Sequence, residues 1–206
     1  MEYLVTMTTH VPEGTSEGAV EDIRTREAAR SRQLATQRNL LRLWRPPLQP
    51  GEWRTLGLFA ADGGAELEKV LASMPLRVWR TDQVTPLSPH PDDPARPTHE
   101  PGTAAPQAEG SEFLTTLAVA VPGDTAPETV DATTRRQADR ARDLARQGRL
   151  ERLWTLPGHG RALGLWRARD PAGMNAILAS LPLHAWMSVQ TTPLTPHPSD
   201  PALTKD

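Results

Sequence analysis

The chain has 206 residues, of which 37% are hydrophobic and 23% are charged, and its formal net charge at pH 7 is −2. This balance is typical of globular chains and leaves no field strong enough to attract nucleic acid or anionic lipid, so we expect neither as a partner. Because the sequence contains no cysteine, disulfides, thiolate metal sites and cysteine nucleophiles are excluded.

The first ninety residues alternate between strand-like and helix-like patterns. Short runs rich in β-branched and aromatic residues predict strands, and apolar residues at helical spacing predict a long helix, capped by Ser16 and ending near Asn39, and a shorter one. In chain order the predicted elements are a strand at 3–8, the long helix, strands at 41–45 and 54–60, a short helix at 65–73 and a strand at 78–87.

Residues 92–110 differ from what precedes them. They are rich in Pro, Ala, Gly and acidic residues and offer nothing to bury, so we predict an extended, flexible connector. A second series of elements then begins with a strand at 113–119. It continues with a long helix that Thr125 caps, that has Pro127 in its first turn and that Gly148 ends.

The sequence contains an internal repeat, in which equivalent residues are first 110 and later 107 positions apart. The matched segments include Val11-Pro12 with Val121-Pro122, Leu43-Trp44 with Leu153-Trp154, Pro75-Leu76 with Pro182-Leu183, and a closing Pro-His-Pro around His90 and His197. Self-similarity of this kind predicts repeated structural units. We therefore predict two homologous domains at 1–91 and 111–198, joined by the connector at 92–110 and followed by a tail at 199–206.

The order of elements in each copy predicts the fold class. The order β-α-β-β-α-β is that of the ferredoxin-like α+β sandwich, in which two helices cover one face of a four-stranded sheet. The other face of such a sheet is apolar and needs a covering partner. A tandem copy supplies that partner at high local concentration, so we predict that the two copies pack as an internal pseudo-dimer of the dimeric α/β-barrel type.

One position in the first long helix stands out because it is charged. On a helical wheel Glu27 falls inside the apolar stripe formed by Val20, Ile23 and Leu34. Desolvation raises the pKa of a carboxyl group, which yields a base able to remove a carbon-bound proton near neutral pH. The alternative is an ordinary ion pair with an arginine close by in the sequence, such as Arg24 or Arg30. In the second copy the equivalent residue is Gln137, which cannot act as a base.

Several short sequence blocks in the two copies occur in the order found in a known protein family. They are Glu27, Leu43-Trp44-Arg45 and Met74-Pro75-Leu76 in the first copy, and Leu153-Trp154, Pro157-Gly158-His159 and Leu181-Pro182-Leu183 in the second. Both copies resemble the muconolactone isomerase family, over residues 3–91 and 113–198. The resemblance implies a ferredoxin-like unit that dimerises and builds larger rings, with active sites at the dimer interface and no cofactor. It also implies a proton shift that moves a double bond in an unsaturated five-membered lactone of aromatic catabolism, with Glu27 matching the family's proton-transfer residue.

The two copies depart from the family pattern in different ways. The tyrosine and asparagine that the family places before its third strand are absent from both, where the sequence reads Trp53-Arg54-Thr55 and Gly160-Arg161-Ala162. The first copy keeps Arg45 and the second has Thr155 instead. The second copy keeps Gly158-His159, and the first has a proline-rich insertion at 46–51. We therefore expect two unlike pockets, one competent or altered and the other silent or purely binding.

The remaining candidates are aromatic and imidazole side chains. Arg45, Trp53 and His159 are candidates for orienting a substrate or stabilising an enolate, and Trp44 and Trp154 are candidates for lining a flat unsaturated ligand. His90 and His197 lie in Pro-His-Pro turns, where a structural tail contact is the simpler interpretation. Since no two of the six histidines are spaced i, i+4, we expect no metal.

We therefore interpret the chain as a cofactor-independent isomerase acting on a small unsaturated lactone or related carbonyl compound, with Glu27 transferring the proton. The alternatives are a cyclase or lyase-like tailoring enzyme on the same scaffold, and a degenerate, non-catalytic ligand-binding pseudo-dimer. No apolar run approaches the roughly 18 residues of a membrane span, and no secretory signal opens the chain. We expect a cytoplasmic protein with a small-molecule substrate and the capacity to form a homo-oligomer of pseudo-dimers.

Overall fold

The computed structural model describes residues 1–95 and 109–203. The chain divides into two compact units, one formed by Met1–Leu87 with the residues from Thr195 onward, the other by Ser88–Leu194. We call them unit 1 and unit 2. Most of the predicted connector, at 96–108, and the last three residues of the predicted tail lie outside the described residues.

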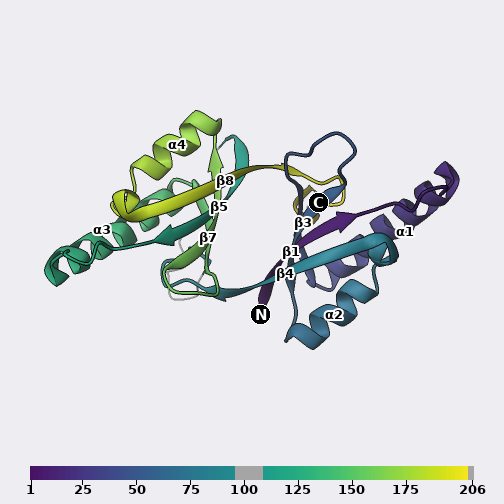
Figure 1. The fold of residues 1–206 in the computed structure, drawn as a ribbon, viewed down its shortest axis with the longest axis horizontal. Coiled ribbons are helices and arrows are strands. Elements are labelled where there is room, and N and C mark those ends of the chain that lie inside the picture. The colour runs from purple at the N-terminus through teal and green to yellow at the C-terminus, as the bar shows by residue number, and fades with distance from the viewer. Residues whose placement is uncertain (96–108, 204–206) are drawn as a thin grey trace. The chain divides into compact units, whose positions relative to one another are not determined.

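Unit 1 has the predicted β-α-β-β-α-β order. It comprises β1 (Glu2–Thr9), α1 (Glu17–Thr36), β2 (Leu40–Arg45), β3 (Arg54–Ala60), α2 (Gly64–Ala72), the 3-10 helix η1 (Pro75–Trp79), most of β4 (Arg80–Pro89), the end of β8 (Met187–Pro196) and η3 (Pro201–Leu203). The strands pair antiparallel in the order β4-β1-β3-β2, and α1 and α2 lie on one side of this sheet (Figure 1). The last strand begins later than the predicted residue 78 because Pro75 starts a 3-10 turn there.

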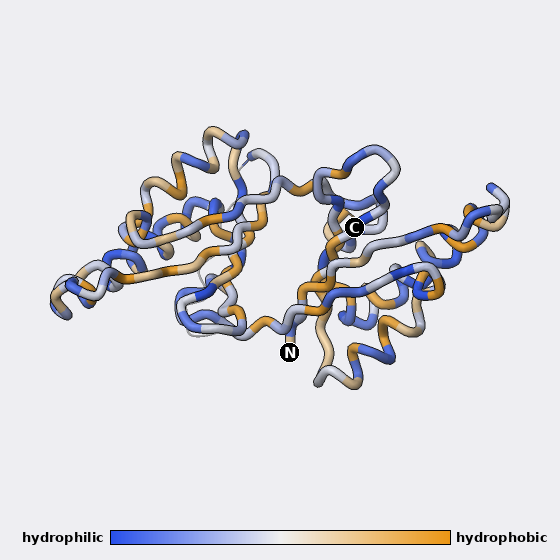
Figure 2. The backbone as a smooth tube through the Cα atoms, in the orientation of Figure 1, coloured by the Kyte–Doolittle hydropathy of each residue, from blue (hydrophilic) through white to orange (hydrophobic). Residues whose placement is uncertain are grey.

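Unit 2 repeats the arrangement. It comprises β5 (Ser111–Val119), α3 (Pro127–Arg146), β6 (Leu150–Thr155), β7 (Arg161–Ala168), α4 (Pro171–Ala179), η2 (His184–Trp186) and most of β8. Its strands also pair antiparallel, in the order β8-β5-β7-β6. Hydrophobic and hydrophilic residues alternate along α2 (Figure 2), as expected of a helix that buries one face on a sheet, whereas α4 is apolar along most of its length. The predicted α+β class is therefore confirmed, and the structure shows that the sheets are antiparallel.

The two copies exchange their C-terminal segments, which the linear repeat does not reveal. Strand β4 continues from unit 1 into unit 2, where Ser88 and Pro89 pair with β6. Strand β8 likewise continues from unit 2 into unit 1, where Thr195 and Pro196 pair with β2. Each Pro-His-Pro segment therefore belongs to the unit built mainly from the other copy.

The helix ends agree with the sequence in part. Ser16 caps α1, since its hydroxyl accepts a hydrogen bond from the Ala19 amide at 3.3 Å. The prediction that Thr125 caps α3 is wrong, because Pro127 occupies the first helical position and leaves the cap to Ala126. At the other end Gly148 adopts a left-handed conformation (φ 68°), and the equivalent residue after α1 is Arg38 (φ 60°).

One glycine in each sheet makes room for a large aromatic ring of the core. A Cβ at Gly57 would lie 2.4 Å from Cε2 of Phe59, and a Cβ at Gly164 would lie 2.3 Å from Nε1 of Trp166. Phe59 and Trp166 are both almost completely buried. Glycine at these positions thus allows each ring to lie across its own strand and fill the core beneath the helices.

Candidate active site

A cavity of about 420 Å³ opens in unit 1 beside α1. Its apolar wall includes Met7, Leu43, Met74 and Leu76, which come from β1, β2 and the region of η1. Its charged and polar lining includes Glu21, Arg24, Glu27, Ser31, Arg32, Arg45, Arg80, His197 and Ser199. A mixed lining and a volume of this size suit a small organic ligand.

Glu27 lies in this cavity with only 13% of its side chain exposed. One carboxylate oxygen, Oε2, accepts a hydrogen bond from the Leu76 amide at 2.9 Å, and the other, Oε1, accepts one from Nη1 of Arg80 at 3.2 Å. Burial raises the pKa of Glu27 and outweighs the opposing effects of the Leu76 amide and the Arg80 charge. The helical wheel thus located a buried carboxylate whose protonated form is favoured by desolvation.

The arginine that pairs with Glu27 is not one of its sequence neighbours. Arg24 instead lies over the ring of Trp53, with its Cζ 4.8 Å from the ring centroid, and Arg30 binds the hydroxyl of Ser73. The partner is Arg80, at the start of β4. Strand β4 brings Arg80 to α1 from 53 residues away, a pairing that helical periodicity cannot indicate.

Arg80 is itself held by a second acid, Asp82. Nε and Nη2 of Arg80 donate to the two carboxylate oxygens of Asp82 at 2.6 and 3.0 Å, and the side chains of both residues are at most 3% exposed. Sequence reasoning missed this pair. A signal did exist, because the second copy has Met187 and Val189 at the equivalent positions of its strand.

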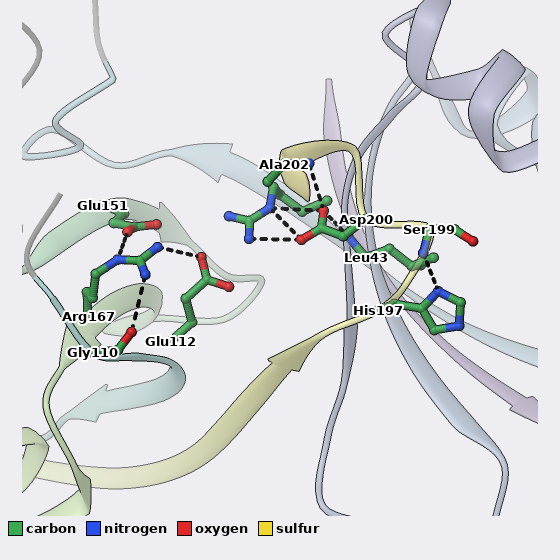
Figure 3. Close-up of polar contacts among 10 residues, drawn as sticks. Leu43, Gly110, Glu112, Glu151, Arg167, His197, Ser199, Asp200 and Ala202 are labelled. Atoms are coloured by element: carbon green, nitrogen blue, oxygen red, sulfur yellow. Dashed lines mark hydrogen bonds and ion pairs between the residues drawn. The ribbon is translucent and has the colours of Figure 1, made fainter. Parts of the chain in front are cut away.

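His197 also lies in the cavity of unit 1, whereas the sequence favoured a structural role for it. Its Nδ1 accepts a hydrogen bond from the Ser199 amide at 3.1 Å (Figure 3), so the neutral ring carries its proton on Nε2. Burial lowers the pKa of His197 to about 4, and the charges of Arg45 and Arg24 contribute in the same direction. The ring is therefore neutral near pH 7 and presents a hydrogen-bond donor.

Asp200 fixes the segment that carries His197. Its side chain is fully buried, and it accepts hydrogen bonds from the Leu43 amide at 3.1 Å and from Nη2 of Arg42 at 3.0 Å (Figure 3). The backbone amide of His197 also donates to the Leu43 carbonyl at 2.9 Å. The C-terminal segment thus lies on β2 through backbone and charge-assisted hydrogen bonds.

The structure brings only some of the predicted site residues together. Arg45 lines the cavity with Glu27. Trp53 does not line it and lies behind Arg24. His159 belongs to unit 2 and is exposed in the β6–β7 turn.

The two repeated tryptophans, Trp44 and Trp154, are each 1% exposed and do not line the cavity. Because side chains alternate along a strand, Leu43 faces the cavity and Trp44 points to the opposite face of the sheet. Cζ of Arg42 lies 4.8 Å from the centroid of Trp44, and Cζ of Arg152 lies 4.6 Å from that of Trp154. This arrangement favours packing roles for both tryptophans.

Unit 2 keeps one hydrogen bond of the site but has no acid there. Oε1 of Gln137 accepts a hydrogen bond from the Leu183 amide at 3.2 Å, the same contact that Glu27 makes with Leu76. The positions equivalent to Arg80 and Asp82 hold Met187 and Val189, neither of which can bind a carboxylate. The polar centre of unit 1 is therefore specific to that unit.

The described part of the chain lacks a metal-binding cluster and a membrane-spanning helix. Within residues 1–95 and 109–203, no cluster of three or more histidine, aspartate or glutamate side chains is arranged to bind a metal ion. No helix in the same ranges is both long and apolar enough to cross a bilayer.

The fold and the cavity define an α+β protein of two ferredoxin-like units, one of which holds a buried carboxylate. The chain belongs to the muconolactone delta-isomerase family, whose model matches residues 1–93 and 111–200. It is 28% identical over 88 residues to a muconolactone delta-isomerase of Rhodococcus opacus, and 32% identical over 91 residues to one of Cupriavidus pinatubonensis. These matches cover 95% and 96% of the relatives but only 43% and 44% of this chain.

Solved structures share the fold over almost the whole chain. A heme-binding protein of Thermus thermophilus superposes with a TM-score of 0.58 at 11% identity, covering 97% of this chain and 93% of that one. A chlorite dismutase variant from Candidatus Nitrospira defluvii has a TM-score of 0.56 at 10% identity, covering 95% and 91%. At these identities the likeness concerns the fold alone.

Proposed function

We propose that unit 1 is a cofactor-independent isomerase that shifts a proton and a double bond in a small unsaturated lactone or related carbonyl compound. The observation that carries the proposal is a buried carboxylate, Glu27, which faces a cavity of suitable size and whose pKa is raised by burial. Membership of the muconolactone delta-isomerase family supports the same reaction class. An unsaturated lactone from aromatic catabolism is the substrate class that this membership favours.

In the proposed reaction, the Glu27 carboxylate removes a proton from a carbon next to the conjugated system of the substrate. The electrons of the broken C–H bond move into the π system and place negative charge on the carbonyl oxygen as a dienolate. The protonated Glu27 then returns its proton to a different carbon, so that the double bond moves and the atoms of the substrate are unchanged. A base with a raised pKa suits both steps, because it must accept and release the same proton.

The charge that forms on the carbonyl oxygen needs a donor in the same cavity. His197 is a candidate because its ring is neutral and carries its proton on Nε2, and Arg45 is a candidate because it lines the same cavity and carries a positive charge. Donors that are already in place stabilise such a charge without reorganisation during the reaction. Both residues are proposed to bind the substrate oxygen, with Glu27 on the proton-transfer side.

The proposal also includes the assembly expected from the sequence. Leu56 and Leu58 on one sheet, and their counterparts Leu163 and Leu165 on the other, are apolar side chains on the face away from the helices. Packing of the two units as an internal pseudo-dimer, and the formation of larger assemblies from it, would bury such faces. The formation of larger assemblies is tested by measuring the molar mass in solution with light scattering.

The test of the reaction is deuterium uptake from heavy water into a butenolide substrate, followed by NMR. Glu27→Gln retains the shape of the side chain and removes the base, so we expect uptake to fall by about 100-fold or more. Asp22→Asn is the matched control, because Asp22 is an exposed carboxylate on the same helix, 65% exposed and paired with Arg26. Full uptake by Glu27→Gln would place the base elsewhere, and tight binding without any uptake would make unit 1 a binding module.

A further inference from the structure

A chain of five alternating charges runs through unit 1 from the surface to Glu27. Beginning at the surface, Nη2 of Arg77 lies 2.9 Å from Oε1 of Glu68, and its Nη1 lies 3.5 Å from Oδ2 of Asp82. Asp82 in turn binds Arg80, which binds Glu27. The exposed side-chain fraction falls from 59% at Glu68 to 2% at Arg80, so the inner members are shielded from solvent.

All five members of this chain are replaced in the second copy. The equivalent residues of unit 2 are Asn175, His184, Val189, Met187 and Gln137. Unit 2 nevertheless forms the same helix, the same 3-10 turn and the same strand at these positions, as α4, η2 and β8. The fold therefore does not require the charges, and they are absent together with the acid that ends the chain.

The position of Asp82 determines how strongly the charge of Arg80 stabilises the ionised form of Glu27. A buried guanidinium beside a carboxylate stabilises its ionised form and weakens it as a base. Asp82 binds Arg80 through two hydrogen bonds at 2.6 and 3.0 Å, whereas Glu27 receives a single longer one at 3.2 Å. Asp82 therefore binds two of the guanidinium's five N–H donors, where Glu27 binds one, and its negative charge offsets that of Arg80.

We propose that Asp82 is a positioning residue for the proton transfer: by binding Arg80 at two atoms, it orients that guanidinium toward Glu27 and offsets its charge, so that Glu27 remains a sufficiently strong base. This inference rests on the proposed function of Glu27. The negative charge of Asp82 also raises the pKa of Glu27 directly, in the direction opposite to Arg80.

Other charged groups face the same cavity and are left unchanged by the test. They are Glu21, Arg24 and Arg32 from α1, Arg45 from β2 and His197 from the C-terminal segment. Arg24 lies over Trp53, and His197 is neutral near pH 7. Because these groups are common to every variant below, differences between variants report on Arg80 and Asp82.

Two variants should shift the pKa of Glu27 in opposite directions. In Asp82→Asn the charge of Arg80 is no longer offset, so we expect the pKa of Glu27 to fall and the acid limb of the deuterium-exchange rate to shift to lower pH. In the double variant Arg80→Met, Asp82→Val, which installs the residues of unit 2, both charges are lost. The contributions of Arg80 that lower the pKa of Glu27 then disappear, and we expect this pKa and the acid limb to shift to higher pH.

The titration of Glu27 is measured directly by NMR of the full-length protein with ¹³C-labelled glutamate, and Glu27→Gln assigns the signal. Asp82→Glu keeps the charge and should restore the wild-type profile. Glu66→Gln is the control, because Glu66 is an exposed carboxylate of α2 that pairs with Lys69; it should leave the profile unchanged.

Opposite shifts of the Glu27 titration in the two variants support the inference. An unmoved titration in both, or a rate that falls equally at all pH values, would overturn it and leave Asp82 a purely structural residue. If Asp82→Asn fails to fold, Asp82→Ser removes the same negative charge with a smaller side chain, and the same fall in the pKa of Glu27 is expected. The titration needs no substrate, so it stays informative if Glu27→Gln shows that the base lies elsewhere.

Discussion

Unit 1 and unit 2 share the same fold and several structural contacts, and they differ in the polar residues around Glu27 and Gln137. In both, a glycine makes room for a core aromatic ring, and a buried aspartate anchors the exchanged segment. In both, an arginine of the long helix also binds a serine at the end of the short helix, Arg30 with Ser73 and Arg140 with Ser180. Arg80 and Asp82, the charged pair that contacts Glu27, have uncharged counterparts in unit 2, Met187 and Val189. The comparison separates the interactions that build this fold from those that serve a site.

Unit 2 has a polar network of its own at a different place. Nη2 of Arg167 lies 3.0 Å from Oε1 of Glu112, and its Nε lies 2.7 Å from Oε1 of Glu151 (Figure 3). Unit 1 has Ala60 at the position equivalent to Arg167. Charged groups in unit 2 thus connect strands β5, β6 and β7 near their ends, whereas those in unit 1 surround a cavity.

The largest effect on stability is expected from the shared anchor. Asp200→Ala leaves Arg42 and the Leu43 amide without their buried acceptor, and we expect the free energy of unfolding to fall by about 3–5 kcal/mol in chemical denaturation. Asp93→Ala should cost a similar amount, because Asp93 binds Arg152 and the Leu153 amide in the same way. Only Asp200→Ala should also weaken ligand binding in the cavity, since Asp200 holds the segment of His197. Equal binding by both variants would contradict this role.

A smaller effect is expected when the acid is introduced into unit 2. Gln137→Glu introduces a carboxylate into unit 2, where Met187 stands at the position of Arg80 and no equivalent guanidinium offsets burial, so its folded-state pKa should lie above the unfolded value of about 4.3. A group of this kind lowers stability once the pH exceeds its folded-state pKa. We expect a loss of about 2 kcal/mol at pH 7 that disappears near pH 4. A loss that is independent of pH would point to a steric cause instead.

His197 should give a comparable or smaller effect with the opposite pH dependence. Its pKa is lowered to about 4 in the folded protein, against about 6.5 when unfolded, so its contribution to stability is present above pH 6.5 and is lost as the pH falls toward 4. Since the ring is partly exposed, we expect about 1–2 kcal/mol over this window. His197→Asn should flatten the unfolding free energy between pH 6.5 and 4 relative to the wild type. An unchanged slope would show that the ring ionises freely.

The smallest effect concerns the end of the long helices. Arg38 adopts a left-handed conformation that Gly148 provides without strain in unit 2. Arg38→Gly should raise the free energy of unfolding by about 1 kcal/mol, and Gly148→Arg should lower it by a similar amount, as measured by thermal denaturation. If both variants were as stable as the wild type, the neighbouring contacts of Arg38 would compensate for the strain.

Much of the fold was predictable from local patterns. The offset repeat predicted two copies, and the alternation of strand and helix patterns predicted the order of elements that the structure shows. The helical wheel predicted that Glu27 lies on the apolar face of its helix, because the period of a helix determines which residues share a face. The predictions that Thr125 caps α3 and that the last strand of unit 1 starts at residue 78 are wrong, because in each case a nearby proline starts a helical turn and moves the boundary.

The amino-acid sequence by itself determined the repeated α+β units and the burial of one carboxylate, because these depend on periodicities within a few turns or strands. Only the tertiary structure decided that Arg80 and Asp82 meet Glu27 and that His197 enters the cavity of unit 1. These contacts join residues far apart in the chain, such as Arg42 and Asp200 at a separation of 158 positions. Strand pairing and segment exchange create such contacts, and no local pattern encodes which distant strand end a segment will join.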